Sequence, residues 1–315
     1  MSAEAAPLVA PRRPRTWRDH VWAGVRWALV VAFAAYLWAA FVHTEFNLYP
    51  LYKNAGRVHQ VMLDLGHPDL SWYERDEQGR VQLFPPMYMP PPEGQPELRR
   101  LDPRSGKPRP GTLPTLLSSM NETLEISLVG TFISVLISFP LAFLSARNLT
   151  RGSALGRIAY SATRAVFNVT RAFPPYILAI IFVMMVGTGP FPGVLALAVH
   201  SIGMMGKLFA ETIESIDIAP VEAVRATGAS NTLIVWFGIL PQVLPQFLAF
   251  SLYRWDMNIR MAFILGIVGA GGIGFLLDQY IRLFKFHQAS TAFIIILVAV
   301  TLLDWASAAL REKLG

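Results

Sequence analysis

Four polar or charged side chains interrupt a long apolar run at about 243–268: Arg254, Asp256, Asn258 and Arg260. A charge at the middle of a bilayer costs at least about 2.5 kcal/mol, so such residues usually face other helices or a water-filled path. Asp256 and Arg260 are four residues apart, the spacing at which helical side chains pair. The group predicts either an ion pair that orders a helix bundle or a cationic lining that eases the passage of an anion.

Three further polar residues are weaker candidates for a pathway: Asn168, Arg171 and His200. A single histidine in an apolar helix is more often hydrogen-bonded within the core. No group of residues in the sequence has the pattern of a catalytic or metal-binding site, so we predict neither.

The glycines Gly269, Gly271, Gly272 and Gly274 fit the pattern G-x-G-x-x-G. A dinucleotide site needs that pattern between a strand and a helix, whereas here it follows an apolar run. We expect a flexible loop or a close-packed corner that lines a pathway and forms an external gate. The phosphate-binding pattern G-x-x-x-x-G-K-[ST] is absent from the sequence, which predicts no ATP site in this chain.

The segment 211–233 is polar and separates two apolar runs. Pro220 can open a helix, because its fixed φ and missing N–H suit a first helical turn. Gly228 lets the chain turn, or lets another backbone approach closely. The segment predicts two short helices that form a rigid knob able to seat in a groove of a partner protein.

The elements that must position these residues are membrane helices. Of 315 residues, 53% are hydrophobic and 15% are charged, against about 25% charged in soluble domains. The net charge is +6, but the arginines cluster at the ends of apolar runs rather than in a stripe beside exposed aromatic residues, which argues against nucleic-acid binding. The absence of cysteine excludes disulfides and thiolate chemistry.

The apolar pattern predicts six transmembrane helices, with both termini in the cytoplasm because basic residues flank them. The third span begins with an arginine-bearing helix over 157–171 and continues, after a break at Pro174-Pro175, as an apolar part over 177–186. The other five spans are expected at about 21–42, 123–146, 194–209, 243–268 and 289–309.

The stretch 44–117 is rich in proline and charge and contains no run apolar enough to span. Its apolar residues between 48 and 65 recur at helical spacing, which suits either a helix on the outer membrane surface or an amphipathic helix packed on the bundle. These are Leu48, Leu51, Tyr52, Ala55, Val58, Met62 and Leu65. The predicted organisation is a cytoplasmic tail at 1–20, a first transmembrane helix at 21–43, an external loop at 44–117 and a core at 118–315.

The spacing Glu-Ala-x-x-x-x-Gly, a gap and Leu-Pro resembles the "EAA" loop of ABC importer permeases, through which the membrane subunit docks on its ATPase. Val224 and Gly238 stand where that pattern prefers Ala and Ile. The resemblance implies an ATPase-coupling loop made of Glu211, Glu214, Pro220, Glu222, Ala223, Arg225, Gly228, Leu240 and Pro241.

Over about 118–312 the chain is similar to the phosphonate-importer branch of these permeases, as in Leu240-Pro-Gln-Val-Leu-Pro-Gln-Phe247 and Gly266-Ile-Val-Gly-Ala-Gly-Gly-Ile-Gly274. Tyr176 stands where the branch has an acidic residue. The resemblance implies an all-α bundle with a type I importer core, working in the bacterial inner membrane as a homodimer. Two ATPases holding ATP and Mg²⁺ and a periplasmic binding protein are the implied partners.

The implied cargo is a phosphonate or a related small oxyanion, moved inward by alternating access. Within the same class, a permease for phosphite or for a methionine-like amino acid is the alternative. From other classes, a passive channel would conduct without ATP, and a membrane scaffold would not couple ATPase turnover to ligand.

Overall fold

The computed structural model describes residues 17–43, 53–85, 104–150 and 152–314. The chain divides into two units, 1–60 and 61–315, and each is described by itself. The first holds helix α1 (Trp17–His43) and the start of α3 (Ala55–Leu65). The basic tail before Trp17 and the predicted amphipathic positions Leu48, Leu51 and Tyr52 lie outside the described residues.

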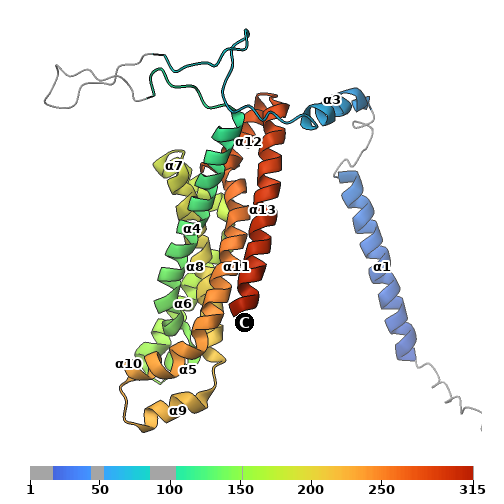
Figure 1. Ribbon diagram of the computed structural model, residues 1–315. Helices are drawn as coiled ribbons and strands as arrows, with labels where there is room; N and C mark the ends of the chain where they lie inside the picture. The colour runs from blue at the N-terminus through green and yellow to red at the C-terminus, as the bar shows by residue number, and fades with distance from the viewer. Residues whose placement is uncertain (1–16, 44–52, 86–103, 151, 315) are drawn as a thin grey trace, which may run out of the picture. The chain divides into compact units, whose positions relative to one another are not determined.

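The second unit contains a bundle of long helices that run side by side (Figure 1). Its main helices are α4 (Thr112–Ser145), α6 (Ala154–Ala172), α7 (Pro175–Val186), α8 (Pro190–Glu214), α11 (Leu240–Ile267), α12 (Gly272–Arg282) and α13 (Phe286–Leu314). Short helices α5 (Arg147–Thr150), α9 (Ile218–Ala226) and α10 (Asn231–Leu233) and a π-helical turn at Ile234–Ile239 connect them. The described residues contain isolated β-bridges but no strand.

Four helical stretches are long and apolar enough to cross a membrane, and the pair α6–α7 makes a fifth if it forms one span. α4 begins at Thr112, eleven residues before the predicted start of the second span, because polar residues such as Asn121 and Glu122 do not end the helix. The first predicted span falls on α1, a helix of 27 residues whose stretch Arg26–Ala40 is apolar. A sixth crossing stays a prediction.

The break predicted at Pro174-Pro175 is a bend of 86° between α6 and α7. A residue before proline is disfavoured in the helical region, so α6 ends at Ala172. Pro175 then occupies the first turn of α7, where its missing N–H leaves no bond unmade. Two prolines thus convert one apolar segment into an elbow.

Buried side chains form three clusters along the bundle. The one beside the 211–233 segment joins α4, α8 and α11 and includes the rings of Phe209 and Phe247, stacked at 4.0 Å between centroids. On α8, Gly206 packs directly against the Phe167 ring of α6, so a side chain at Gly206 would collide with it. Close packing of this kind fixes α6 against α8.

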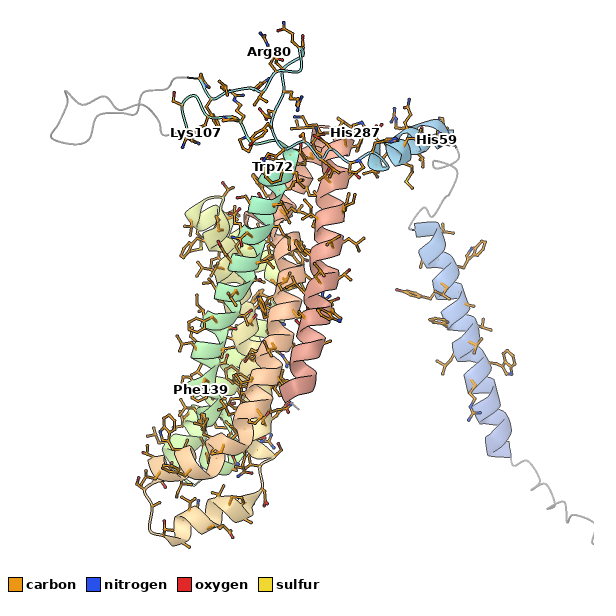
Figure 2. All side chains as sticks on the ribbon, in the orientation of Figure 1. His59, Trp72, Arg80, Lys107, Phe139 and His287 are labelled. Carbon is orange, nitrogen blue, oxygen red and sulfur yellow. The ribbon has the colours of Figure 1, made fainter. Side chains whose placement is uncertain are left out.

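The two ends of the bundle differ in what they carry. The segments 66–85 and 104–111 lie at the end that holds α12 and the start of α13, and α9 lies at the opposite end (Figure 1). Figure 2 labels four residues at the end that holds α12, which are Trp72, Arg80, Lys107 and His287. The predicted irregular loop is partly ordered, since antiparallel bridges pair Tyr73 with Pro110 and Leu83 with Pro108, among others.

Candidate functional site

The polar segment after α8 folds as a short helix at one end of the bundle. α9 begins at Ile218 and not at Pro220, because the Asp217 side chain accepts the Ala219 N–H at 3.0 Å and caps the helix. Pro220 lies within the first turn, as its missing N–H predicted, although the helix begins two residues earlier than Pro220. The aspartate two residues ahead of Ala219 was the signal that sequence reasoning missed.

One side of α9 is anchored in the bundle through Val221, its only buried residue. Val221 lies over Gly238 in the π-helical turn, where an added Cβ would stand 3.2 Å from the Val221 Cα. The position at which the family pattern prefers isoleucine therefore needs a small residue in this chain. The glycine lets the two backbones meet.

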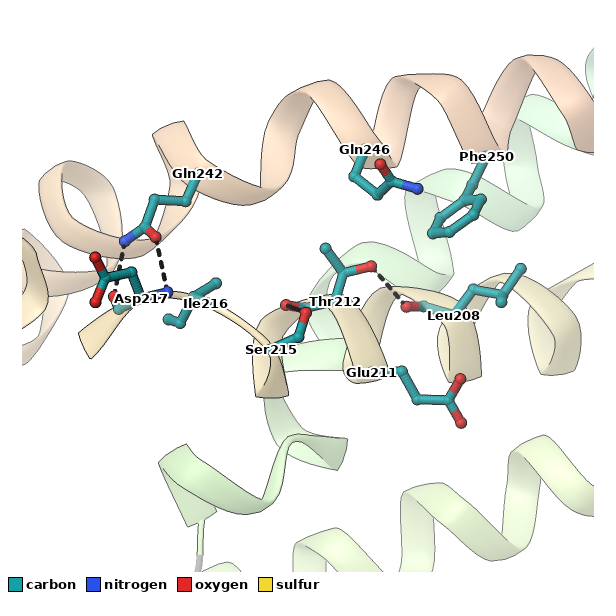
Figure 3. A pocket seen from close by; sticks show the side chains of 9 residues that line it. All are labelled: Leu208, Glu211, Thr212, Ser215, Ile216, Asp217, Gln242, Gln246 and Phe250. Atoms are coloured by element: carbon teal, nitrogen blue, oxygen red, sulfur yellow. Dashed lines mark hydrogen bonds between the residues drawn. The ribbon is translucent and has the colours of Figure 1, made fainter. Parts of the chain in front are cut away.

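Gln242, in the first turn of α11, binds the start of the same segment. Its side chain accepts the Asp217 N–H at 3.1 Å and donates to the carbonyls of Asp217 (3.2 Å) and Gly238 (2.6 Å). Gln242 and Gln246 line a cavity of about 490 Å³ between α11 and the end of α8 (Figure 3). Sequence reasoning did not single out Gln242, because its role depends on a contact 25 residues away.

Two glutamates at the end of α8 have different surroundings. Glu214 accepts the Arg147 N–H at 2.8 Å and an Arg164 N–H at 2.9 Å, so it ties α8 to α5 and α6. Glu211 faces the cavity and forms an exposed ion pair with Lys207 at 3.6 Å. Glu214, which the resemblance assigns to the ATPase-coupling loop, thus also links α8 to α5 and α6 within the bundle.

The outer side of α9 is free for a partner. Glu222, Ala223 and Arg225 are exposed, and neither charge forms an ion pair within the described residues. Gly228 has φ = +78°, which confirms the predicted turn. The remaining predicted positions, Leu240 and Pro241, form the first turn of α11.

The predicted pairing of Asp256 with Arg260 is confirmed, at 2.5 Å. Arg260 also binds Asp304 of α13 at 2.9 Å and 3.1 Å, a partner that the sequence spacing could not reveal. The Asp256 side chain is 7% exposed. For Arg260, the structural ion pair is therefore the interpretation that the contacts support.

Arg254 and Asn258 lie on the buried face of α11 against α8 and α4. The Arg254 Nε donates to Ser201 Oγ at 2.9 Å, and the Asn258 amide donates to Thr131 Oγ1 at 2.8 Å and to Ser201 Oγ at 3.1 Å. Hydroxyl and amide groups from three helices thus meet near the middle of the bundle. No carboxylate within the described residues pairs with Arg254.

The three weaker candidates lie beside this group, around the α6–α7 elbow. His200 precedes Ser201 and its Nδ1 contacts the Phe173 carbonyl at 3.0 Å. The backbone of Arg171 packs against Gly203 of α8, and Asn168 is exposed on the preceding turn of α6. The fold brings all three to the α6–α8 side of the bundle.

The predicted glycine corner is close-packed. Gly269, Gly271 and Gly272 all have positive φ, and Gly189 N–H donates to the Gly269 carbonyl at 2.9 Å. The Ile273 N–H donates to Thr123 Oγ1 at 2.9 Å, and a side chain at Gly274 would collide with the Phe263 carbonyl. The corner lies at the α12 end of the bundle, beside a cavity of about 290 Å³. Its role as a gate stays a prediction.

Known proteins resemble this chain over the same core. The family described as "Binding-protein-dependent transport system inner membrane component" matches residues 138–314. The phosphite transport system permease protein PtxC of Stutzerimonas stutzeri is 44% identical over 191 residues, which are 61% of this chain and 68% of that protein. The phosphate-import permease protein PhnE of Mycolicibacterium smegmatis is 44% identical over 193 residues, covering 61% of this chain and 36% of that protein.

The fold also has a solved counterpart. A chain of the MetNI methionine ABC transporter, in an inward-facing conformation, superposes with a TM-score of 0.55 at 23% identity, over 64% of this chain and 96% of that one. The exposed α9 segment, the helical bundle behind it and the match over 138–314 lead to one assignment. This chain belongs to the family of binding-protein-dependent transport system inner membrane components.

Proposed function

We propose that this chain is the membrane-spanning subunit of an ATP-driven importer that moves phosphite, a phosphonate or a related small oxyanion inward. Relatives named for phosphite and phosphate transport are 44% identical to it, whereas the methionine transporter chain is 23% identical. The observation that carries the proposal is α9: a short helix anchored by Val221 and Gln242, with its opposite side exposed at one end of the bundle.

The exposed side of α9 is the proposed dock for a separate ATPase that binds ATP and Mg²⁺. Two copies of the chain would form the pathway, with one ATPase on each. A binding protein would deliver the anion at the opposite end, where 66–85 and 104–111 lie. Both termini, including the 1–20 tail, would then be cytoplasmic, the 44–117 stretch would be external, and Gly269–Gly274 would gate the external side.

The proposed mechanism is alternating access. ATP binding draws the two ATPases together, and each pulls on an α9 segment. Because Gln242 and Val221 bind α9 to the start of α11, that pull reorients the spans around the pathway. A permease must release its cargo, so specificity resides mostly in the binding protein.

The proposal is tested by reconstituting the permease, its ATPase and its binding protein in proteoliposomes and measuring uptake of phosphite and methylphosphonate. We expect uptake that requires ATP and stops when the ATPase is catalytically disabled. Uptake that persists with a disabled ATPase would indicate a channel, and ATPase turnover insensitive to ligand would indicate a scaffold. ATP-driven uptake of methionine but of neither anion would refute the proposed cargo.

A further inference from the structure

Arg254 is a buried cation without a compensating charge. The residue is 8% exposed, and its Nη2 is buried without a hydrogen-bond partner in the described part of the chain. Its one described hydrogen bond goes to a neutral hydroxyl, that of Ser201. Arg260, six residues further along α11, is instead bound by two aspartates. Helix α11 therefore holds two arginines with different surroundings: aspartates neutralise Arg260, and no described carboxylate pairs with Arg254.

The described neighbours that surround Arg254 are neutral polar groups rather than competing anions. The Asn258 Nδ2 donates to Thr131 and to Ser201, and the Asn258 Oδ1 accepts the Ser201 hydroxyl at 3.3 Å instead of a guanidinium N–H. A guanidinium presents paired N–H groups that match the oxygens of phosphate-like anions. An oxyanion at Nη2 would supply the acceptor that the protein lacks there.

The depth of Arg254 makes a surface role untenable. It lies near the middle of α11, and its partner Ser201 lies near the middle of α8. The neighbouring His200 contacts the Phe173 carbonyl, where the two prolines bend the α6–α7 segment. A charge at mid-span is costly, and ionisable residues at that depth face the bundle interior or a water-filled cavity, where they mark substrate and ion pathways.

A second, independent observation comes from α6. Its polar residues recur at alternating steps of four and three, the spacing of a single helical face, and are Arg157, Ser161, Arg164, Asn168 and Arg171. Within this stripe, Arg164 pairs with Glu214 at the end of α8 that leads to α9, and the backbone of Arg171 lies against Gly203, two residues from Ser201. The stripe therefore runs along α6 from the α9 end of the bundle to the level of Gly203, and its side chains at Arg157, Ser161, Asn168 and Arg171 are exposed.

We propose that Arg254 transiently binds the transported oxyanion at mid-membrane through its free Nη2, and that the polar stripe of α6 lines the way from there to the α9 end. This inference rests on the proposed function, because it takes the cargo to be an anion. A single guanidinium without a second cation binds weakly enough to release its ligand, as transport requires.

The test compares Arg254→Met and Arg254→Lys with wild type in the reconstituted complex. Arg254→Met keeps the volume and removes the charge, so we expect uptake of phosphite and methylphosphonate to fall about tenfold or more. The melting temperature should stay or rise, because an uncompensated buried charge is lost. ATPase stimulation by the loaded binding protein should stay within about twofold of wild type, and Arg254→Lys should keep part of the uptake. Arg282→Gln, an exposed arginine on α12, is the matched control and should transport normally.

Two results would overturn the inference. One is uptake by Arg254→Met within about twofold of wild type at equal membrane abundance, since a tenfold loss is expected. The other is a joint fall in melting temperature, ATPase stimulation and uptake, which would make Arg254 a structural residue. If wild type itself imports neither anion but imports another solute with ATP, the proposed cargo is wrong and the inference falls with it. Normal anion uptake by both the wild type and Arg254→Met refutes the inference about Arg254 and leaves the proposed cargo standing.

Discussion

Gln242 holds the backbone of Asp217 from both sides: its Oε1 accepts the Asp217 N–H, and its Nε2 donates to the Asp217 carbonyl. Asp217 in turn caps α9. The start of α9 and the first turn of α11 are therefore joined by one side chain. Because α11 continues to Arg254, this joint links the docking helix to the middle of the membrane span.

Gln242→Ala should uncouple ATPase turnover from transport. The variant loses three hydrogen bonds of a partly exposed side chain, each worth about 1 kcal/mol. We expect ATPase activity to continue while uptake per ATP falls several-fold, roughly three- to tenfold for a loss of 0.7–1.4 kcal/mol in coupling. Uptake and ATP hydrolysis are measured together in proteoliposomes. Gln246→Ala is the control, because Gln246 lines the same cavity but makes no hydrogen bond within the described residues.

Gly228→Ala should weaken the turn after α9 through backbone strain alone. The residue has φ = +78°, and an added Cβ would meet no atom within 4 Å, so space is not the obstacle. An alanine in the left-handed region costs about 1–2 kcal/mol, and asparagine costs less. We expect Gly228→Ala to reduce ATPase binding in a pull-down more than Gly228→Asn. Equal binding by the two variants would contradict the role assigned to the turn.

Arg260→Gln should lower stability more than transport. The change removes the ion pair between Arg260 and Asp256, whose side chain is 7% exposed, and a hydrogen bond to a charged group is worth about 1.5–3 kcal/mol. We expect a lower melting temperature and lower abundance, with near-normal uptake per folded molecule. Adding Asp256→Asn removes the buried carboxylate charge and should restore part of the stability. Loss of uptake at normal stability would instead give Arg260 a pathway role.

Asp69 should make the end of the bundle that holds α12 and the start of α13 sensitive to acid. Partial burial would raise the pKa of Asp69, but hydrogen bonds from Thr112, Ser71 and Gln288 outweigh it and lower the pKa below 3.8. A carboxylate with a depressed pKa stabilises the folded form above its unfolded pKa and stops doing so as pH falls through the lowered value. The contribution is thus complete at neutral pH, begins to fall near the ordinary pKa of 3.8, and is lost as pH passes the lowered pKa of the folded form.

Asp69→Asn at neutral pH should reproduce that loss. We expect faster hydrogen exchange at 67–73 and at the start of α4, because Asp69 Oδ2 binds Thr112 at 2.6 Å and Gln288 at 3.2 Å. Exchange measured by mass spectrometry on the complex checks this. Asp76→Asn is the matched control, because Asp76 bonds only within its own turn, to Gln78 and Arg80. Unchanged hydrogen exchange in Asp69→Asn would refute the role of Asp69 in holding the segment 67–73 to α4 and α13.

Local chemistry made part of the fold predictable. The elbow follows from two adjacent prolines, the Asp256–Arg260 pair from a spacing of four, and the turn at Gly228 from a residue without a side chain. Each depends on neighbours in the sequence. The start of α4 at Thr112 was missed because polar residues inside a membrane helix near its end carry no signal for where the helix begins.

The parts of the site that depend on tertiary contacts were not predictable. The spacing of four pairs Arg260 with Asp256, but it reveals neither the second carboxylate, Asp304 of α13, nor the buried Arg254 Nη2 that lacks a partner in the described part of the chain. Gln242 likewise gains its role from the backbone of Asp217. Such distinctions arise where helices far apart in sequence meet.

The chain leaves the bundle at Ser71 and re-enters it at Leu113, and these two points are bonded to each other. Thr112 N–H donates to Ser71 Oγ, Leu113 N–H donates to the Ser71 carbonyl, and Gly111 N–H donates to the Trp72 carbonyl. Since Ser71 and Trp72 are fastened to 111–113, the start of α4 is held at this joint. The turn at 76–80 bonds within itself, so a reporter or an epitope inserted there would leave the joint and the helices in place.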